Sequence, residues 1–139
     1  MNGQLFEGKE QIFRDVIQLG EKWKVAVDRS SSDGGSPEDI RAFQLTEEGK
    51  KIRELNEELE SYLENLEFDD IRMIQTVMYL GRDRDYPKTE SPEEIYENYL
   101  QDLSSDGWNS KEVEIRQMTS KVPFSSYLEN GLEILQVKL

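Results

Sequence analysis

The residues best placed to do chemistry are Arg82 and Asp83, which directly follow an apolar stretch. From Ile71 to Leu80, seven of ten residues are apolar, and at the helical period they cover most of the circumference. A side chain that leaves the end of such a buried helix is held firmly, as a binding site requires. A guanidinium beside a carboxylate suits an anion or another small polar ligand. The alternative is structural: a cation near a helix C-terminus offsets the helix dipole, and Arg82 pairs with a carboxylate.

The sequence lacks the residues that most enzymes use. It contains no cysteine and no histidine, which excludes disulfides, thiolate nucleophiles, and the commonest general base and metal ligand. A calcium loop counted from Asp28 also fails, because its sixth residue is Asp33 instead of glycine and its twelfth is Asp39 instead of glutamate. We therefore expect no catalytic residues, no bound metal and no cofactor, so that an enzyme is the less favoured interpretation.

Negative charge is concentrated in one segment. The chain carries a formal net charge of −13, and residues 47–70 alone hold ten acidic side chains against three basic ones. Such a surface repels nucleic acid and anionic membranes, so we expect neither as a partner. It suits a basic protein instead, and we take Glu57, Glu60 and Glu64 as the candidate partner-binding residues. The alternative is an ordinary solvated helix face in an acidic protein.

Apolar spacing and capping residues predict an all-α fold. Residues 5–27 place apolar side chains at the i, i+3, i+4, i+7 positions of one long helix. Further helices are expected to start at capping residues, which are Ser36, Thr46, Asp69, Ser91 and either Asn109 or Ser110. Gly81 is placed to end the helix at 69–82, and a last helix occupies 124–135. We therefore predict a single all-α domain, 1–139, of about six helices packed around the buried helix at 69–82.

Two glycines, Gly20 and Gly131, fall on the apolar faces of their predicted helices. A glycine inside a helix costs about 1 kcal/mol relative to alanine. We therefore expect a favourable interaction that offsets this cost at each position. The missing side chain offers one, because it lets another helix approach closely. We expect both glycines to mark close contacts between helices.

Four segments resemble parts of one known family and occur in the same order. They are DRSSSDGGSPED at 28–39, ELESYLENLEFDD at 58–70, MYLGRD at 78–83 and VPFSSYLENGLEIL at 122–135. Together they resemble an uncharacterised bacterial family, domain of unknown function three-seven-seven-five. The resemblance implies a helical domain of bacterial origin and brings no established activity, substrate or cofactor. It adds Asp33 to the site candidates, and Arg29 lies in the same loop. The chain departs from the family pattern by a longer region after Asp83.

Two functions of different classes fit these observations. The first is a non-enzymatic protein-interaction module that binds a basic protein through its acidic surface, or a second copy of itself through a homodimer surface. The second is a small-molecule or anion-binding module with its site near Arg82, Asp83 and the 28–36 loop. The start of the chain lacks the basic and apolar pattern of a signal peptide, and no segment is long enough to cross a membrane, so we expect a cytoplasmic protein.

Overall fold

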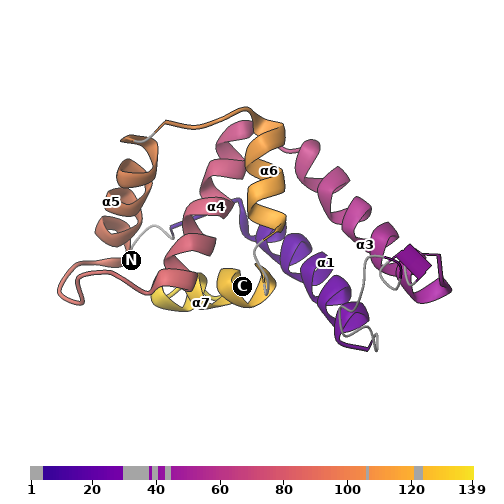
Figure 1. The fold of residues 1–139 in the computed structure, drawn as a ribbon. Coiled ribbons are helices and arrows are strands. Elements are labelled where there is room, and N and C mark those ends of the chain that lie inside the picture. The colour runs from indigo at the N-terminus through magenta and orange to yellow at the C-terminus, as the bar shows by residue number, and fades with distance from the viewer. Residues whose placement is uncertain (1–4, 30–37, 39–40, 43–44, 106, 121–123) are drawn as a thin grey trace.

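The computed structural model describes residues 5–29, 38, 41–42, 45–105, 107–120 and 124–139. These residues confirm the predicted all-α fold, with six helices of at least nine residues and no strand among them (Figure 1). The helices are α1 Glu10–Arg29, α3 Glu47–Glu64, α4 Phe68–Asp83, α5 Pro92–Ser105, α6 Lys111–Thr119 and α7 Phe124–Ile134. The helix expected at Ser36 falls largely outside the described residues.

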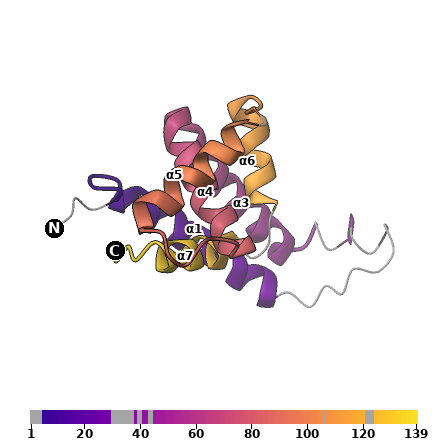
Figure 2. The same cartoon turned by 90° about the vertical axis from the view of Figure 1, so that its left-hand side faces the viewer.

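Helix α4 contributes the most buried residues of the described helices. It packs most extensively against α7 and also contacts α5 and α6, while α1 packs against α3 and α7. In two perpendicular views α7 lies at the lower end of α4 (Figure 1 and Figure 2). The core around α4 draws on every other helix through Phe13, Val16, Leu63, Ile95, Ile115, Met118 and Leu128. None of the described helices combines the length and the apolar character needed to cross a bilayer.

The crossing of α4 and α7 depends on two glycines. A Cβ atom added at Gly131 would lie within 3.0 Å of the Val77 carbonyl of α4. A Cβ atom added at Gly81 would lie equally close to the Tyr127 carbonyl of α7. Neither glycine has room for a methyl group, so the backbones of α4 and α7 are in direct contact. The close contact expected at Gly131 is therefore confirmed.

The prediction that Gly81 ends the helix is wrong. Helix α4 continues through Gly81 to Asp83, and its C-cap is Arg84, which adopts a left-handed conformation with φ 54°. The Arg84 N–H closes the helix by donating to the Leu80 carbonyl at 2.8 Å. The glycine at position 81 is needed for helix packing and not for chain reversal.

Gly20 of α1 makes a looser contact of the same kind. Its added Cβ would stand 3.0 Å from the Ser125 Cβ and 3.4 Å from the Phe124 ring, both on α7. These neighbours are side chains, which move more easily than the carbonyls met at Gly81 and Gly131. The expected close approach at Gly20 is present, but it is less strict.

Side-chain caps occur at three of the predicted helix starts. The Thr46 and Ser110 hydroxyls each accept a hydrogen bond from the N–H three residues further on, at 3.1 and 3.3 Å. At the start of α5, Ser91 Oγ accepts from the Glu94 N–H while Glu94 Oε1 accepts from the Ser91 N–H, both at 3.2 Å. This reciprocal pair is a capping box, and it satisfies two backbone donors at once.

Two other predicted starts are wrong. Helix α1 begins at Glu10 instead of at the beginning of the apolar pattern, because Phe6 and Gly8 have φ values of 93° and 84°, which a right-handed helix excludes. Helix α4 begins after Glu67, whose side chain makes no cap hydrogen bond. Asp69 therefore lies inside the first turn, where its charge still faces the positive end of the helix dipole.

Replacing Gly131 by alanine should destabilise the protein, because the new methyl group meets the α4 backbone at Val77. Overpacking of this kind costs about 1–3 kcal/mol, which lowers the melting temperature by roughly 3–10 °C in a chain of this size. Thermal melting followed by circular dichroism measures the loss. Asn130→Ala, one residue earlier on α7, is the control and should melt close to the wild type. Equal losses in the two variants would contradict the close crossing.

Candidate functional sites

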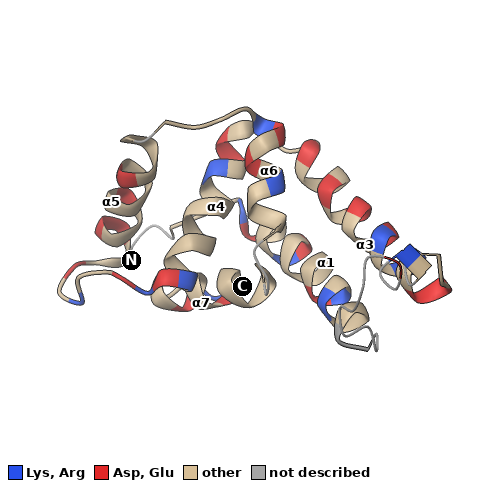
Figure 3. Cartoon of the chain, viewed as in Figure 1, with Lys and Arg blue, Asp and Glu red and all other residues tan. Residues whose placement is uncertain are grey.

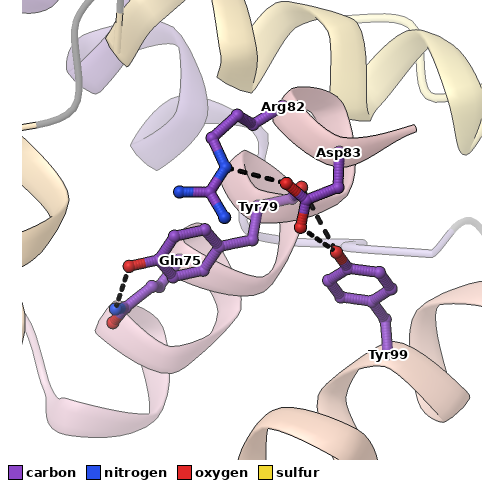
Figure 4. A network of polar contacts seen from close by, with 5 residues as sticks. All are labelled: Gln75, Tyr79, Arg82, Asp83 and Tyr99. Atoms are coloured by element: carbon purple, nitrogen blue, oxygen red, sulfur yellow. Dashed lines mark hydrogen bonds and ion pairs between the residues drawn. The ribbon is translucent and has the colours of Figure 1, made fainter. Parts of the chain in front are cut away.

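Arg82 and Asp83, the predicted site residues, lie together in the last turn of α4. Arg82 Nε donates to Asp83 Oδ1 at 2.8 Å, and the guanidinium carbon stands 4.6 Å from the centre of the Tyr79 ring (Figure 4). The Tyr99 hydroxyl of α5 donates to Asp83 Oδ2 at 2.7 Å. Both Arg82 and Asp83 remain accessible to solvent. The network therefore ties α4 to α5 while leaving the arginine open to the outside.

The same contacts set the ionisation of the network. Burial opposes the charge on Asp83, but hydrogen bonds from Arg82 and Tyr99 outweigh it and hold the pKa of this carboxyl below its ordinary value. Burial and the bond to Asp83 raise the pKa of the Tyr99 hydroxyl. At neutral pH the carboxylate is therefore charged and the tyrosine stays a hydrogen-bond donor.

A buried polar pair joins α4 to α6 nearby. Gln75 is 2% exposed and Glu114 is 4% exposed. Gln75 Nε2 donates to Glu114 Oε1 at 2.8 Å, and the Asn109 N–H donates to Glu114 Oε2 at 2.7 Å. Gln75 Oε1 is buried and has no hydrogen-bond partner in the described part of the chain. Buried polar atoms are nearly always satisfied, so this acceptor needs an explanation.

A hollow of about 390 Å³ connects the buried pair with the Arg82 network. The described residues that line it with polar or aromatic groups are Gln75, Tyr79, Arg82, Asp83, Trp108, Asn109, Glu114 and Gln117. Of these residues, Arg82 and Asp83 are the two that the sequence had indicated. Gln75 gave a usable signal, because a glutamine interrupts an otherwise apolar stretch of α4. Glu114 gave none, since nothing in the sequence distinguishes it among 30 acidic residues.

The 28–36 segment contributes no described residue to this hollow. The predicted loop begins later than expected, because Asp28 and Arg29 still belong to α1. Asp33 and the Arg29 side chain, both predicted to bind a ligand, lie outside the described residues. The hollow is instead completed by residues of α6 and of the connection that precedes it.

The acidic face predicted on α3 is open to solvent. Acidic side chains recur along this helix, whereas its basic residues gather near its start (Figure 3). Glu57 and Glu64 are exposed. Glu60 is half-buried, and its Oε1 accepts a hydrogen bond from the Asn56 side chain at 2.7 Å. Two of the three predicted partner-binding carboxylates therefore point into solvent, and the third is partly engaged within the helix.

A groove of about 870 Å³ runs between α1 and α3. Its apolar lining includes Leu55, which is buried, and Val25, which is 43% exposed. Its charged lining comprises four acidic and two basic residues: Glu21, Glu47, Glu48, Glu58, Lys22 and Lys51. The groove is thus apolar within and net negative at its edges. The sequence alone does not indicate this groove, because the groove forms where two helices pack against each other.

A pair of carboxylates from different helices stands beside this groove. Glu21 of α1 accepts a hydrogen bond from Ser125 Oγ of α7 at 3.1 Å. Burial and a hydrogen bond with Glu21 raise the pKa of Glu129 on α7, and Lys24 counters the shift only in part. The negative charge of Glu21 therefore disfavours the charged form of Glu129 across the contact of α1 with α7.

Comparison with known protein families, curated proteins and solved structures finds no match for the chain. Within the described residues, no three acidic, histidine or cysteine side chains are grouped as a metal site would need. The features from which a function can be inferred are therefore the hollow, the acidic face and the groove.

The Asp83 carboxyl should titrate below its ordinary pKa of about 3.9, and Tyr99→Phe should raise that pKa. A carboxyl whose pKa is lower in the folded than in the unfolded state stabilises the fold at pH values above the unfolded-state pKa. This contribution is therefore lost as the pH falls below about 4. NMR titration of the Asp83 carboxyl measures the shift. At neutral pH the same variant should lose about 1 kcal/mol or less of unfolding free energy. An unchanged pKa in Tyr99→Phe would show that the hydroxyl does not bind Asp83.

Glu129→Gln should raise the melting temperature at neutral pH by removing the repulsion from Glu21. A carboxyl whose pKa is raised in the folded state stabilises the fold at low pH. This stabilisation is lost as the pH rises through the folded-state pKa. The difference between variant and wild type should therefore shrink below about pH 4. Glu133→Gln, an exposed position one turn further along α7, serves as the control. A difference that does not change with pH would contradict repulsion between Glu21 and Glu129 as its cause.

Proposed function

We propose that this protein is a non-enzymatic interaction module that binds a basic amphipathic helix of a partner protein in the groove between α1 and α3. The observation that carries the proposal is the exposed apolar surface at this groove. Val25, 43% exposed, lies in the groove together with Ala26 and the buried Leu55. It is one of the four large apolar side chains that are exposed in the described part of the chain. A large exposed apolar side chain that lies in a groove with further apolar lining marks a candidate interaction surface.

Charge complementarity selects the class of partner. The groove edges carry a formal excess of negative charge, and the acidic face with Glu57 and Glu64 continues along the same helix. An amphipathic helix that inserts apolar residues between α1 and α3 therefore places lysine or arginine side chains against these edges. Such pairing gives specificity and faster association more than it gives affinity. A nucleic acid or an anionic membrane would be repelled by the same surface.

The proposal extends to the origin and location of the protein. The resemblance of its ordered segments to domain of unknown function family three-seven-seven-five supports a bacterial origin, and we extend the proposal to a cytoplasmic protein of that family. A second copy of the chain is the competing occupant of the groove. Because each copy brings its own acidic edges, like charges would meet across that interface, which disfavours a homodimer at this surface.

A designed helical peptide with leucines on one face and lysines on the other should bind the groove, and Val25→Glu should weaken that binding about tenfold or more. The change buries a charge where an apolar contact is expected. Replacing both Glu57 and Glu64 by lysine should also weaken binding, and by a larger factor at low salt than at high salt, because salt screens the charges. Fluorescence anisotropy of the labelled peptide measures these affinities.

The matched control is Val113→Glu, because Val113 on α6 is also exposed, at 37%, but lies outside the groove. It should bind the peptide like the wild type. A scrambled peptide of equal charge without an apolar face should bind weakly. Equal binding of the scrambled peptide, equal loss in both valine variants, or a concentration-dependent dimer that Val25→Glu dissociates would each overturn the proposal.

A further inference from the structure

We infer that the hollow between α4 and α6 is a second binding site, which takes a small zwitterion with separated charges, such as a dipeptide. The site is built from the Arg82 network and the buried Gln75–Glu114 pair, and it shares no residue with the groove between α1 and α3. Either proposal can therefore fail without the other.

The first element of the site is the free end of Arg82. Its Nε is occupied by Asp83, and stacking on Tyr79 fixes the plane of the guanidinium. The two terminal nitrogens point away from the aspartate, over the tyrosine ring (Figure 4). A planar guanidinium held in this way presents paired N–H donors that match a carboxylate. This end of the hollow accordingly suits the anionic group of a ligand.

The second element is Glu114, a buried carboxyl without a cation. None of the ion pairs formed by the described residues includes it. Within the described part of the chain, the hydrogen bonds that it accepts come from an amide side chain and a backbone N–H. Burying a carboxylate without a cation is costly, and Gln75 Oε1 beside it also lacks a donor. An ammonium group of a ligand would supply the missing charge and up to three donors.

The charges of the lining exclude simpler ligands. Asp83 and Glu114 outweigh Arg82, so the formal charge of these three residues is negative and disfavours a simple anion. A simple cation would leave the terminal nitrogens of Arg82 unused. A molecule that carries both charges satisfies both ends of the site. The volume of the hollow, about 390 Å³, is within the range of small-molecule sites.

The spacing of the two ends sets the length of the ligand. Arg82 lies over the face of the Tyr79 ring, whose hydroxyl lies 3.5 Å from Gln75 Nε2 (Figure 4), and the same Gln75 amide donates to Glu114. Among the described residues Arg82 and Glu114 form no ion pair with each other, so the two charged groups of the ligand must be farther apart than the two atoms of an ion pair. The termini of a dipeptide meet this condition, whereas those of a free α-amino acid are too close together.

The test is a binding assay with unblocked dipeptides that cover apolar, polar and charged side chains. The chain has two tryptophans, so Trp23→Phe leaves Trp108 in the hollow as the only fluorescent reporter of its class. At least one dipeptide should change the Trp108 emission and raise the melting temperature. Its N-acetylated form and its C-terminal amide, each lacking one charge, should bind at least about tenfold more weakly. A free amino acid should also bind more weakly.

Variants assign the binding to the two ends. Arg82→Gln and Glu114→Gln should each weaken the dipeptide at least about tenfold, and Arg82→Lys should recover only part of the affinity. Arg84→Gln, an exposed arginine outside the hollow, is the control and should bind like the wild type. If Glu114→Gln fails to fold, the N-acetylated dipeptide tests the same contact on the wild type. No response to any dipeptide, equal binding of the blocked forms, or equal loss in Arg84→Gln would overturn the inference.

Discussion

The direct contact between the backbones of α4 and α7, at Gly81 and Gly131, is the constraint on which the rest of the structure depends. Dispersion forces fall steeply with distance, so a crossing without side chains between the helices gains contacts that bulkier residues would prevent. Gly81 immediately precedes Arg82. The contact that secures the end of α4 therefore also sets the position of the Arg82–Asp83 network, and Tyr99 then attaches α5 to that network.

The two proposed binding surfaces follow from how differently the helices are supported. Helix α4 has neighbours along its length, and it gives the hollow a rigid wall with Gln75 and Arg82. Helices α1 and α3 extend side by side beyond the other helices, toward the lower right of Figure 1. Toward that end the other described helices cover fewer of their apolar side chains, and Val25 is exposed in a groove. A rigid polar hollow and an open apolar groove suit different classes of ligand.

The sequence predicted well the features that depend on neighbouring residues. The caps at Thr46, Ser91 and Ser110 and the all-α fold follow from local chemistry. The close helix contact at Gly131 could be predicted because a glycine inside a helix is unfavourable unless packing requires it. Gly81 was misassigned because a glycine near a helix end serves equally as a terminator or as a packing site. The Gln75–Glu114 pair joins residues 39 positions apart, so only the tertiary structure identifies it.

Native-state hydrogen exchange along α4 and α7 tests the central claim most directly. If the glycine crossing holds the fold together, the amides of Val77, Gly81 and Leu128–Leu132 should exchange only through global unfolding and should be the most protected in the chain. The first turn of α3, which stands at the open end of the groove, should exchange much faster. Protection in α7 no greater than that in the first turn of α3 would contradict the account.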